Sequence, residues 1–399
     1  MHEIQEEEQR VLIGFALSHC KQILLAIKKG FGRIRRNYPI SLGRVLFFNG
    51  LKRNNAAPLI GKGLVLVLGR EDVGVDFGTA TCLVAVKGRS IVLREAALCA
   101  LDRNTRNIIA VGDEALRMLG KTPGHILLMR PLKHGSVSDY DITTRMLRYY
   151  LRKVQGRRAL LRPRVFLCVP GSVTDVEKRS VSDAMLDAGA RRTQLVDNAV
   201  AAAIGAGLDV AGQYGHLLVD VGGGVTDIAV VSMGRVVARD ATRAGGDRFH
   251  ESIMRELRRK HNLMIGERTA EELKTTMGAA VPRDTPMYMD VTGRNLILGL
   301  PRTVRVNSDE LIESMEEPAR DIIEGVHSVL EHTPPELAAD IFERGMTLVG
   351  GGALLTGLAE TLSNQLKIPC RTPNDPAACA AFGLAHIMDN LETMGELLS

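Results

Sequence analysis

Two short segments of the chain, centred on Asp76 and Asp220, carry the same pattern of residues. The first reads Val-Gly-Val-Asp-Phe-Gly-Thr-Ala over 73–80, and the second reads Leu-Val-Asp-Val-Gly-Gly-Gly-Val-Thr over 218–226. In each, a short apolar strand leads to an aspartate, which is followed by glycine, a hydroxyl residue and a second apolar strand. Glycines let backbone N–H groups approach a phosphate closely, and two aspartates can hold a divalent cation through water. The pair predicts a duplicated chain that holds a nucleotide between its two halves.

The composition is that of a soluble globular protein with two domains or one large bilobed domain. The chain has 399 residues, of which 45% are hydrophobic and 24% are charged. Its six cysteines form no Cys-x-x-Cys pair, which predicts buried thiols in a reducing compartment and no metal or disulfide framework. The net charge of +5 comes from residues 1–70, which contain twelve Lys or Arg against four Glu. A basic arm on a nearly neutral body argues against nucleic acid as the partner.

The N-terminal extension, residues 1–70, contains a candidate amphipathic helix. Its apolar seam runs at helical spacing through Ile13, Leu17, Cys20, Leu24, Ile27, Phe31 and Ile34. Lysines and arginines crowd the flanks, and the apolar stretch is too short to cross a bilayer, which takes about 20 residues. We interpret the segment as a helix that lies on anionic lipid. A short coiled-coil seam, a poorly ordered arm and an over-extended start site are the alternatives.

The rest of the chain alternates apolar strands with helical patterns, which predicts an α/β architecture with sheets covered on both faces. The expected strands include 82–86, 91–100, 165–169, 194–196, 228–231 and 346–349. The expected helices include 175–188, 199–206 and 248–260.

Several motifs in this region resemble those of MreB, the bacterial actin. They are Asp-Phe-Gly-Thr-Ala from Asp76, Arg-Pro-Leu from Arg130, Ala-Ala-Ala-Ile-Gly-Ala-Gly from Ala201, Asp-Val-Gly-Gly-Gly from Asp220, Gly-Gly-Asp-Arg-Phe from Gly245, Ile-Gly-Glu-Arg-Thr-Ala-Glu-Glu-Leu-Lys from Ile265 and Gly-Gly-Gly from Gly350. The resemblance extends over about 73–390. It implies an actin-like bilobed fold of two duplicated α/β domains, 71–212 and 213–390, with the C-terminal helix returning to the first domain and a tail at 391–399.

The resemblance also implies a function. Proteins of this family bind ATP and Mg²⁺ between the lobes and polymerise into filaments. The filaments lie in the cytoplasm on the inner membrane face, where they organise membrane proteins of cell-wall elongation and set cell shape.

The motifs assign candidate residues to the nucleotide. The first phosphate motif supplies Asp76, Gly78, Thr79 and Ala80, and the second supplies Asp220, Gly222, Gly223 and Gly224. Asp76 and Asp220 would organise a hydrated Mg²⁺. The resemblance implies that Gly350, Gly351 and Gly352 form a backbone shelf near the adenosine, and that Glu271 and Lys274 contact ribose and adenine. From the sequence alone, Glu271 and Lys274 also read as a surface ion pair at i, i+3.

Two departures from the family pattern fall around one water molecule. The family has a glutamate that polarises the attacking water where this chain has Asn198, and a threonine that holds it where this chain has Val225. The neighbouring Thr226 is kept. An amide can orient water but cannot accept its proton, so we expect slow or absent ATP hydrolysis, although actin itself has a glutamine at the first position. The alternative is that Asp197 or Thr226 takes over the role.

Two further segments carry expectations. Leu160 and Leu161 lie among Arg157, Arg158, Arg162 and Arg164. They match a family loop that inserts apolar residues into the membrane, although two adjacent leucines are often a local packing contact. His250 replaces a residue that is usually acidic in the family, and we expect it on the surface without a catalytic role.

Two functions of other classes remain open at this stage. One is a non-polymerising, nucleotide-locked adaptor or regulator of another MreB. The other is a small-molecule kinase of the same superfamily, for which the sequence offers no acceptor site.

Overall fold

The computed structural model describes residues 71–133, 135–156 and 162–394. The predicted N-terminal helix, Leu160 and Leu161 lie outside these ranges. No helix in the described ranges is long and apolar enough to cross a membrane.

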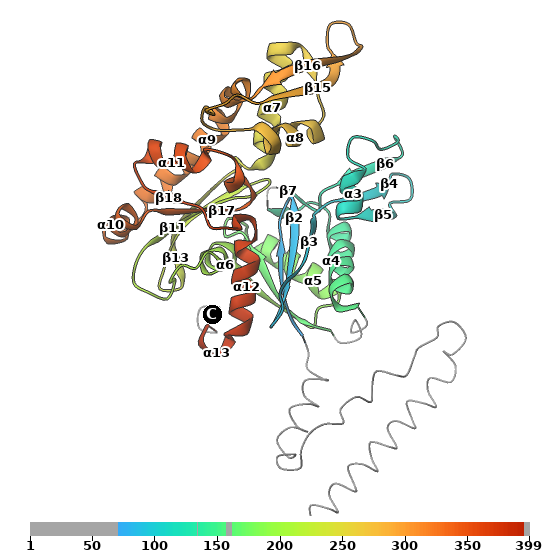
Figure 1. Cartoon of the computed structure of the whole chain (residues 1–399). Helices are drawn as coiled ribbons and strands as arrows, with labels where there is room; N and C mark the ends of the chain where they lie inside the picture. The colour runs from blue at the N-terminus through green and yellow to red at the C-terminus, as the bar shows by residue number, and fades with distance from the viewer. Residues whose placement is uncertain (1–70, 134, 157–161, 395–399) are drawn as a thin grey trace, which may run out of the picture. The chain divides into compact units, whose positions relative to one another are not determined.

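Two five-stranded sheets repeat one topology (Figure 1). The first has the order β3-β2-β1-β9-β10 and the second β13-β12-β11-β17-β18. In each, an antiparallel meander of three strands is extended on one side by two parallel strands. The first sheet consists of β1 (Asp72–Phe77), β2 (Thr81–Val86), β3 (Ser90–Ala96), β9 (Arg164–Val169) and β10 (Arg192–Asp197). The second consists of β11 (His216–Val221), β12 (Thr226–Ser232), β13 (Arg235–Thr242), β17 (Met346–Val349) and β18 (Cys370–Arg371).

Each sheet is associated with a smaller three-stranded sheet. The first small sheet is β5 (Ile108–Val111), β4 (Cys99–Asp102) and β6 (Ile126–Met129), with α3 (Asp113–Arg117) against it. The second is β14 (Leu263–Met264), β15 (Tyr288–Asn295) and β16 (Pro301–Asn307), next to α7 (Gly246–His261) and α8 (Glu267–Met277). A two-stranded ribbon, β7 (Leu132–Lys133) and β8 (Ser136–Val137), completes the strands of the described ranges. The duplicated α/β fold predicted from the sequence is confirmed.

The remaining helices cover the large sheets or connect their strands. They are α4 (Tyr140–Gln155), α5 (Asp175–Ala188), α6 (Asn198–Gly205), α9 (Ser308–Glu331), α10 (Pro335–Arg344), α11 (Leu358–Leu366), α12 (Cys379–Asp389) and α13 (Leu391–Met394), with the 3₁₀ turns η4 (Gly351–Leu354) and η5 (Pro376–Ala378). Local signals set several of these bounds. The helix predicted over 175–188 starts at a capping box between Thr174 and Glu177, which satisfies free N–H groups of its first turn.

Helices α6 and α12 lie between the two large sheets (Figure 1). Side chains from both sheets and both helices form one buried cluster, which includes Phe166, Ala202, Leu218 and Leu384. The two helices approach so closely that glycine is required at the contact. A Cβ added at Gly383 would lie 1.8 Å from the carbonyl oxygen of Ala201, far inside van der Waals contact. This contact holds the two halves of the molecule together.

We predict that Gly383→Ala destabilises the protein by about 1–3 kcal/mol, because the added methyl group forces helices α6 and α12 apart. Chemical denaturation of the purified protein measures the change. Gly124→Ala is the matched control, since a Cβ there has no neighbouring atom within 4 Å. Equal stability of the two variants would contradict the packing described for α6 and α12.

Candidate functional site

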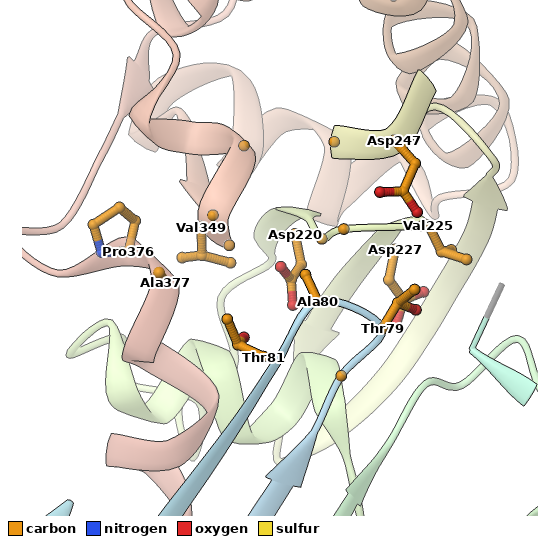
Figure 2. A pocket seen from close by; sticks show the side chains of 18 of the residues that line it. Thr79, Ala80, Thr81, Asp220, Val225, Asp227, Asp247, Val349, Pro376 and Ala377 are labelled. Carbon is orange, nitrogen blue, oxygen red and sulfur yellow. The ribbon is translucent and has the colours of Figure 1, made fainter. Parts of the chain in front are cut away.

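A cavity of about 460 Å³ lies between the two large sheets, at the turns β1–β2 and β11–β12 (Figure 2). Fifteen of the residues predicted from the sequence line it: Asp76, Gly78, Thr79, Ala80, Asn198, Asp220, Gly222, Gly223, Gly224, Val225, Glu271, Lys274, Gly350, Gly351 and Gly352. Residues far apart in the chain therefore converge on one volume. Thr226, the remaining predicted residue of the described ranges, is not part of the lining.

The two glycine-containing turns have the same internal hydrogen bond and touch each other. Gly78 N–H donates to Thr81 O at 2.9 Å, and Gly222 N–H donates to Val225 O at 3.0 Å. A Cβ added at Gly223 would lie 2.7 Å from the Cβ of Ala80. Only glycine allows this approach, so the backbone N–H groups of both turns lie next to one small volume. Such an arrangement suits the oxygens of a phosphate chain.

The third glycine segment follows strand β17 and passes along the second turn. Gly350 has φ +82°, a conformation that residues with side chains rarely adopt, and its Cβ would lie 2.3 Å from Oδ1 of Asp220. A Cβ at Gly352 would lie 2.2 Å from Cγ1 of Val221. The glycines thus keep this wall of the cavity flat and formed by backbone.

The two motif aspartates form the acidic centre of the site. Burial raises the pKa of Asp76 to about 7, and the charge of Asp220 adds to the shift. Burial also raises the pKa of Asp220, while a hydrogen bond from Asn198 opposes the change. Two buried carboxylates with raised pKa values on one cavity are stabilised in their charged form by a cation. Carboxylate oxygens are hard ligands of the kind that Mg²⁺ prefers, so the residues present fit that ion.

The predicted water-activating positions are Asn198 and Val225. Asn198 begins helix α6, and its Nδ2 donates to Oδ2 of Asp220 at 2.7 Å. The side chain of Val225 faces the cavity without a hydrogen-bonding group (Figure 2). Of the two positions, one is therefore hydrogen-bonded to Asp220 and the other is apolar.

The two residues considered as substitutes for these positions are engaged elsewhere. Asp197 caps helix α6 through Ala199 N–H at 3.0 Å, and its other oxygen accepts from Arg239 at 2.6 Å. Thr226 is buried, and its hydroxyl donates to Ala244 O at 2.8 Å. Neither side chain lines the cavity.

Asp227 is a cavity residue to which the sequence analysis assigned no role. It lies on strand β12, directly opposite Asp220 of β11, and its side chain is among those that surround the cavity in Figure 2. Burial raises its pKa to about 7, and the charges of Asp197 and Asp220 add to this, while Arg239 and the N–H of Gly171 oppose it. The available signal was an aspartate directly before the apolar run Ile228–Val231.

Glu271 and Lys274 lie one turn apart on helix α8 and both face the cavity. Nζ of Lys274 lies 3.5 Å from Gly246 O, at the start of helix α7 and close to the second glycine turn. Burial lowers the pKa of Lys274, and the charges of Glu271 and Asp247 oppose this. Of the two alternatives for this pair, a cavity position and a surface ion pair, the structure shows the cavity position.

One arginine connects the two halves across the cavity. Arg130, next to strand β6, donates to Thr79 O at 3.2 Å and to Glu267 on helix α8 at 2.9 Å. Its guanidinium also lies 3.9 Å from Asp247 on helix α7. The ion pairs join the first small sheet to the helices beside the second, at the same cavity that the turns form.

The expectation that His250 lies on the surface was wrong. Its side chain is only 5% exposed and lines the cavity, because position 250 lies on the face of helix α7 that also buries Phe249 and Ile253. Burial lowers the pKa of His250 to about 3, and the charges of Lys274 and Arg130 contribute. The imidazole is therefore neutral at physiological pH.

Arg164, for which a lipid contact was expected, has protein partners in the structure. Arg164 begins strand β9, where its guanidinium forms a two-pronged ion pair with Asp72 at 3.0 and 2.6 Å. It also lies 4.9 Å from the centre of the Phe166 ring. These contacts hold the side chain against the sheet. Arg162 is exposed, and Arg157, Arg158, Leu160 and Leu161 lie outside the described residues.

Two sheets of one topology, with paired Asp-Gly turns at a cavity between them, define an actin-like fold. A family model described as "MreB/Mbl protein" matches residues 70–396. The chain is 42% identical over 330 residues to the cell shape-determining protein MreB of Escherichia coli, covering 82% of this chain and 95% of that protein. It is 41% identical over 324 residues to the cell shape-determining protein Mbl of Bacillus subtilis, covering 81% and 97%.

A solved structure agrees with these relatives. The crystal structure of MreB5 of Spiroplasma citri bound to ADP has a TM-score of 0.77 and 31% identity, and covers 82% of this chain and 99% of that one. The protein described here belongs to the MreB/Mbl family of cell shape-determining proteins, as the motifs indicated.

We predict that Asp76→Asn stabilises the nucleotide-free protein at pH 8 by roughly 2–4 kcal/mol. In the unaltered protein, Asp76 has a folded-state pKa of about 7 against an ordinary value of 3.8. The folded protein is therefore most stable when this carboxyl is neutral, and that stability is lost as the pH rises through 7. The gain should therefore shrink as the pH falls from 8 towards 4. Thermal unfolding at several pH values measures it, and a lower melting temperature for the variant at pH 8 would refute this electrostatic description.

Proposed function

We propose that the protein binds ATP with Mg²⁺ in the cavity between its two large sheets. The observation that carries this proposal is the contact of the two glycine turns, which brings two buried aspartates and two sets of backbone N–H groups to one volume. The backbone of both turns and the hydroxyl of Thr79 would hold the phosphates. Glu271, Lys274 and the shelf Gly350–Gly352 would contact the ribose and adenine.

Asp76 and Asp220 would hold the metal through its water ligands. A bound Mg²⁺ would neutralise charge on the phosphates and on both carboxylates. Two structures of one similar protein support a nucleotide as the ligand. MreB5 of Spiroplasma citri has been solved bound to ADP and to AMPPNP, and the AMPPNP structure has 30% identity and a TM-score of 0.77. Arg130 would then help to close the two halves over the bound nucleotide.

We also propose that ATP hydrolysis is weakened. Hydrolysis needs a water molecule held in line with the γ-phosphate, and misplacing that water removes much of the rate. Asn198 cannot accept a proton and is bonded to Asp220. Val225 offers the water no hydrogen bond, and Asp197 and Thr226 are engaged outside the cavity.

The experiment measures phosphate release and ATP binding on the same sample of full-length protein with Mg²⁺. The unaltered protein should bind ATP and release phosphate slowly. Introducing Asn198→Glu and Val225→Thr together should raise the rate by roughly 10²-fold, within the range that general-base catalysis supplies. Each single variant is the control and should gain less.

Two results would count against the proposal. Failure to bind ATP would remove the nucleotide function altogether. Binding with rapid turnover, unaffected by either substitution, would leave a working ATPase and remove only the proposal of weakened hydrolysis.

We further propose that the protein self-associates into actin-like filaments on the inner membrane, where it organises membrane proteins of cell-wall elongation and contributes to cell shape. Its relatives Mbl and MreB are cell shape-determining proteins, which supports the contribution to cell shape. The basic segment 1–70 supports attachment to anionic lipid, with Leu160 and Leu161 as a second apolar anchor. Two weak anchors bind a membrane more stably than one.

Co-sedimentation with vesicles that contain anionic lipid tests attachment, and electron microscopy of the same sample tests polymerisation. We predict that deletion of residues 1–70 lowers the vesicle-bound fraction severalfold, and that Leu160→Ser with Leu161→Ser lowers it further. Unchanged binding in both variants would reject both anchors. Absence of polymer at high protein concentration, with ATP and lipid present, would favour the non-polymerising adaptor.

A further inference from the structure

Asp227 is the one cavity carboxylate that strand β12 contributes, and it lies beside the altered water site. It follows Val225 by two residues, and its cross-strand neighbour Asp220 accepts the hydrogen bond of Asn198. The residue is 6% exposed and lines the cavity. It therefore faces the same volume as the two residues that replace the usual water-activating groups.

Most of the hydrogen-bonding capacity of Asp227 is unused in the described structure. The N–H of Gly171 lies near enough to lower its pKa, but neither carboxylate oxygen has a hydrogen bond of ordinary geometry among the described residues. A buried polar group without a partner is costly, about 1–3 kcal/mol and more for a charged group, so such groups normally bind water or a ligand. The cavity supplies the space for that water.

Other polar groups near this point are already engaged. Asp197 is held by Arg239 and by the N-terminus of helix α6, and Asn198 is held by Asp220. The hydroxyl of Thr226 faces away from the cavity, towards Ala244 O. The guanidinium of Arg239 bonds to Asp197 and lies against Gly171, where an added Cβ would be 0.8 Å from Nη1 of the arginine. Protein therefore closes the side of Asp227 that faces Arg239 and Gly171.

We propose that Asp227 orients the water molecule that attacks the γ-phosphate of ATP. This inference rests on the proposed function, because it needs ATP in the cavity. The carboxylate accepts a hydrogen bond from the water and directs the water's lone pair towards the phosphorus. As the bond from the water oxygen to the γ-phosphorus forms, the bond from that phosphorus to the β–γ bridging oxygen breaks. Its electron pair stays on ADP, and the water proton leaves with the phosphate.

On this basis, Asp227 accounts for the hydrolysis that remains when Asn198 and Val225 occupy their positions. An aspartate with two accepting oxygens takes the place of the missing glutamate and threonine in orienting the water. Asp227 lies on strand β12, whereas the usual groups would lie at the start of helix α6 and in the turn before β12. We therefore expect the orientation to be poorer and the reaction slower than in a site with all the usual groups.

The test measures single-turnover hydrolysis of γ-labelled ATP at high concentrations of full-length protein, together with ATP affinity by calorimetry. Asp227→Asn should lower the hydrolysis rate at least tenfold, while the Kd for ATP changes less than threefold. Asp227→Glu should recover part of the rate, because it restores an accepting carboxylate. Asp290→Asn, on the exposed face of strand β15, is the matched control and should leave both quantities unchanged.

A second comparison separates a role in hydrolysis from a structural role. In protein that carries Asn198→Glu and Val225→Thr, the water has its usual partners, so Asp227→Asn should lower the rate much less than it does in the unaltered protein. An equal loss in both backgrounds would assign Asp227 to folding or metal binding and overturn the inference.

The remaining outcomes are also decisive. Equal hydrolysis by Asp227→Asn and the unaltered protein overturns the inference and leaves the proposed function intact. ATP binding without measurable hydrolysis in the unaltered protein has the same consequence. Absence of ATP binding in the unaltered protein removes the proposed function and the inference with it.

Discussion

The contact between the two glycine turns is the constraint on which the rest of the site depends. Gly223 approaches Ala80 so closely that a Cβ would lie 2.7 Å from the alanine Cβ. This contact places Asp76 and Asp220 on one cavity, where burial raises the pKa of both carboxyls. The molecule thereby contains an acidic centre that is unfavourable without a cation and becomes favourable when a metal and phosphates share the space. The close packing of helices α6 and α12 holds the two sheets in the position that this contact requires.

Much of the fold could be predicted from the sequence because its signals are local. The repeated strand–Asp–Gly pattern predicted two similar sheets, and the helix predicted over 175–188 has its observed bounds. What could not be predicted depended on side chains from distant segments. His250 is buried because its helix face meets the cavity, and strand pairing brings Arg164 next to Asp72. Only the folded structure shows that Asp227 has no hydrogen bond of ordinary geometry among the described residues while Asp197 and Thr226 are engaged.

Under the proposed function, the site would combine a complete set of phosphate-binding groups with an altered set of groups around the attacking water. The first set is formed mostly by backbone and glycine, so its geometry is fixed by the turns themselves. The second set consists of individual side chains, each of which can change without disturbing the fold. We infer that this division allows a protein of the MreB/Mbl family to keep a nucleotide clamp while its rate of hydrolysis changes. Filaments of such a protein would persist longer, because hydrolysis would dismantle them slowly.

The measurement that tests the central claim most directly is the affinity for ATP with Mg²⁺ and with a chelator in its place, by calorimetry on full-length protein. If Asp76 and Asp220 repel the phosphates until a cation lies between them, ATP should bind at least tenfold more tightly with Mg²⁺. Equal affinity under the two conditions would mean that the paired aspartates do not form a metal-dependent nucleotide clamp, and would contradict the account.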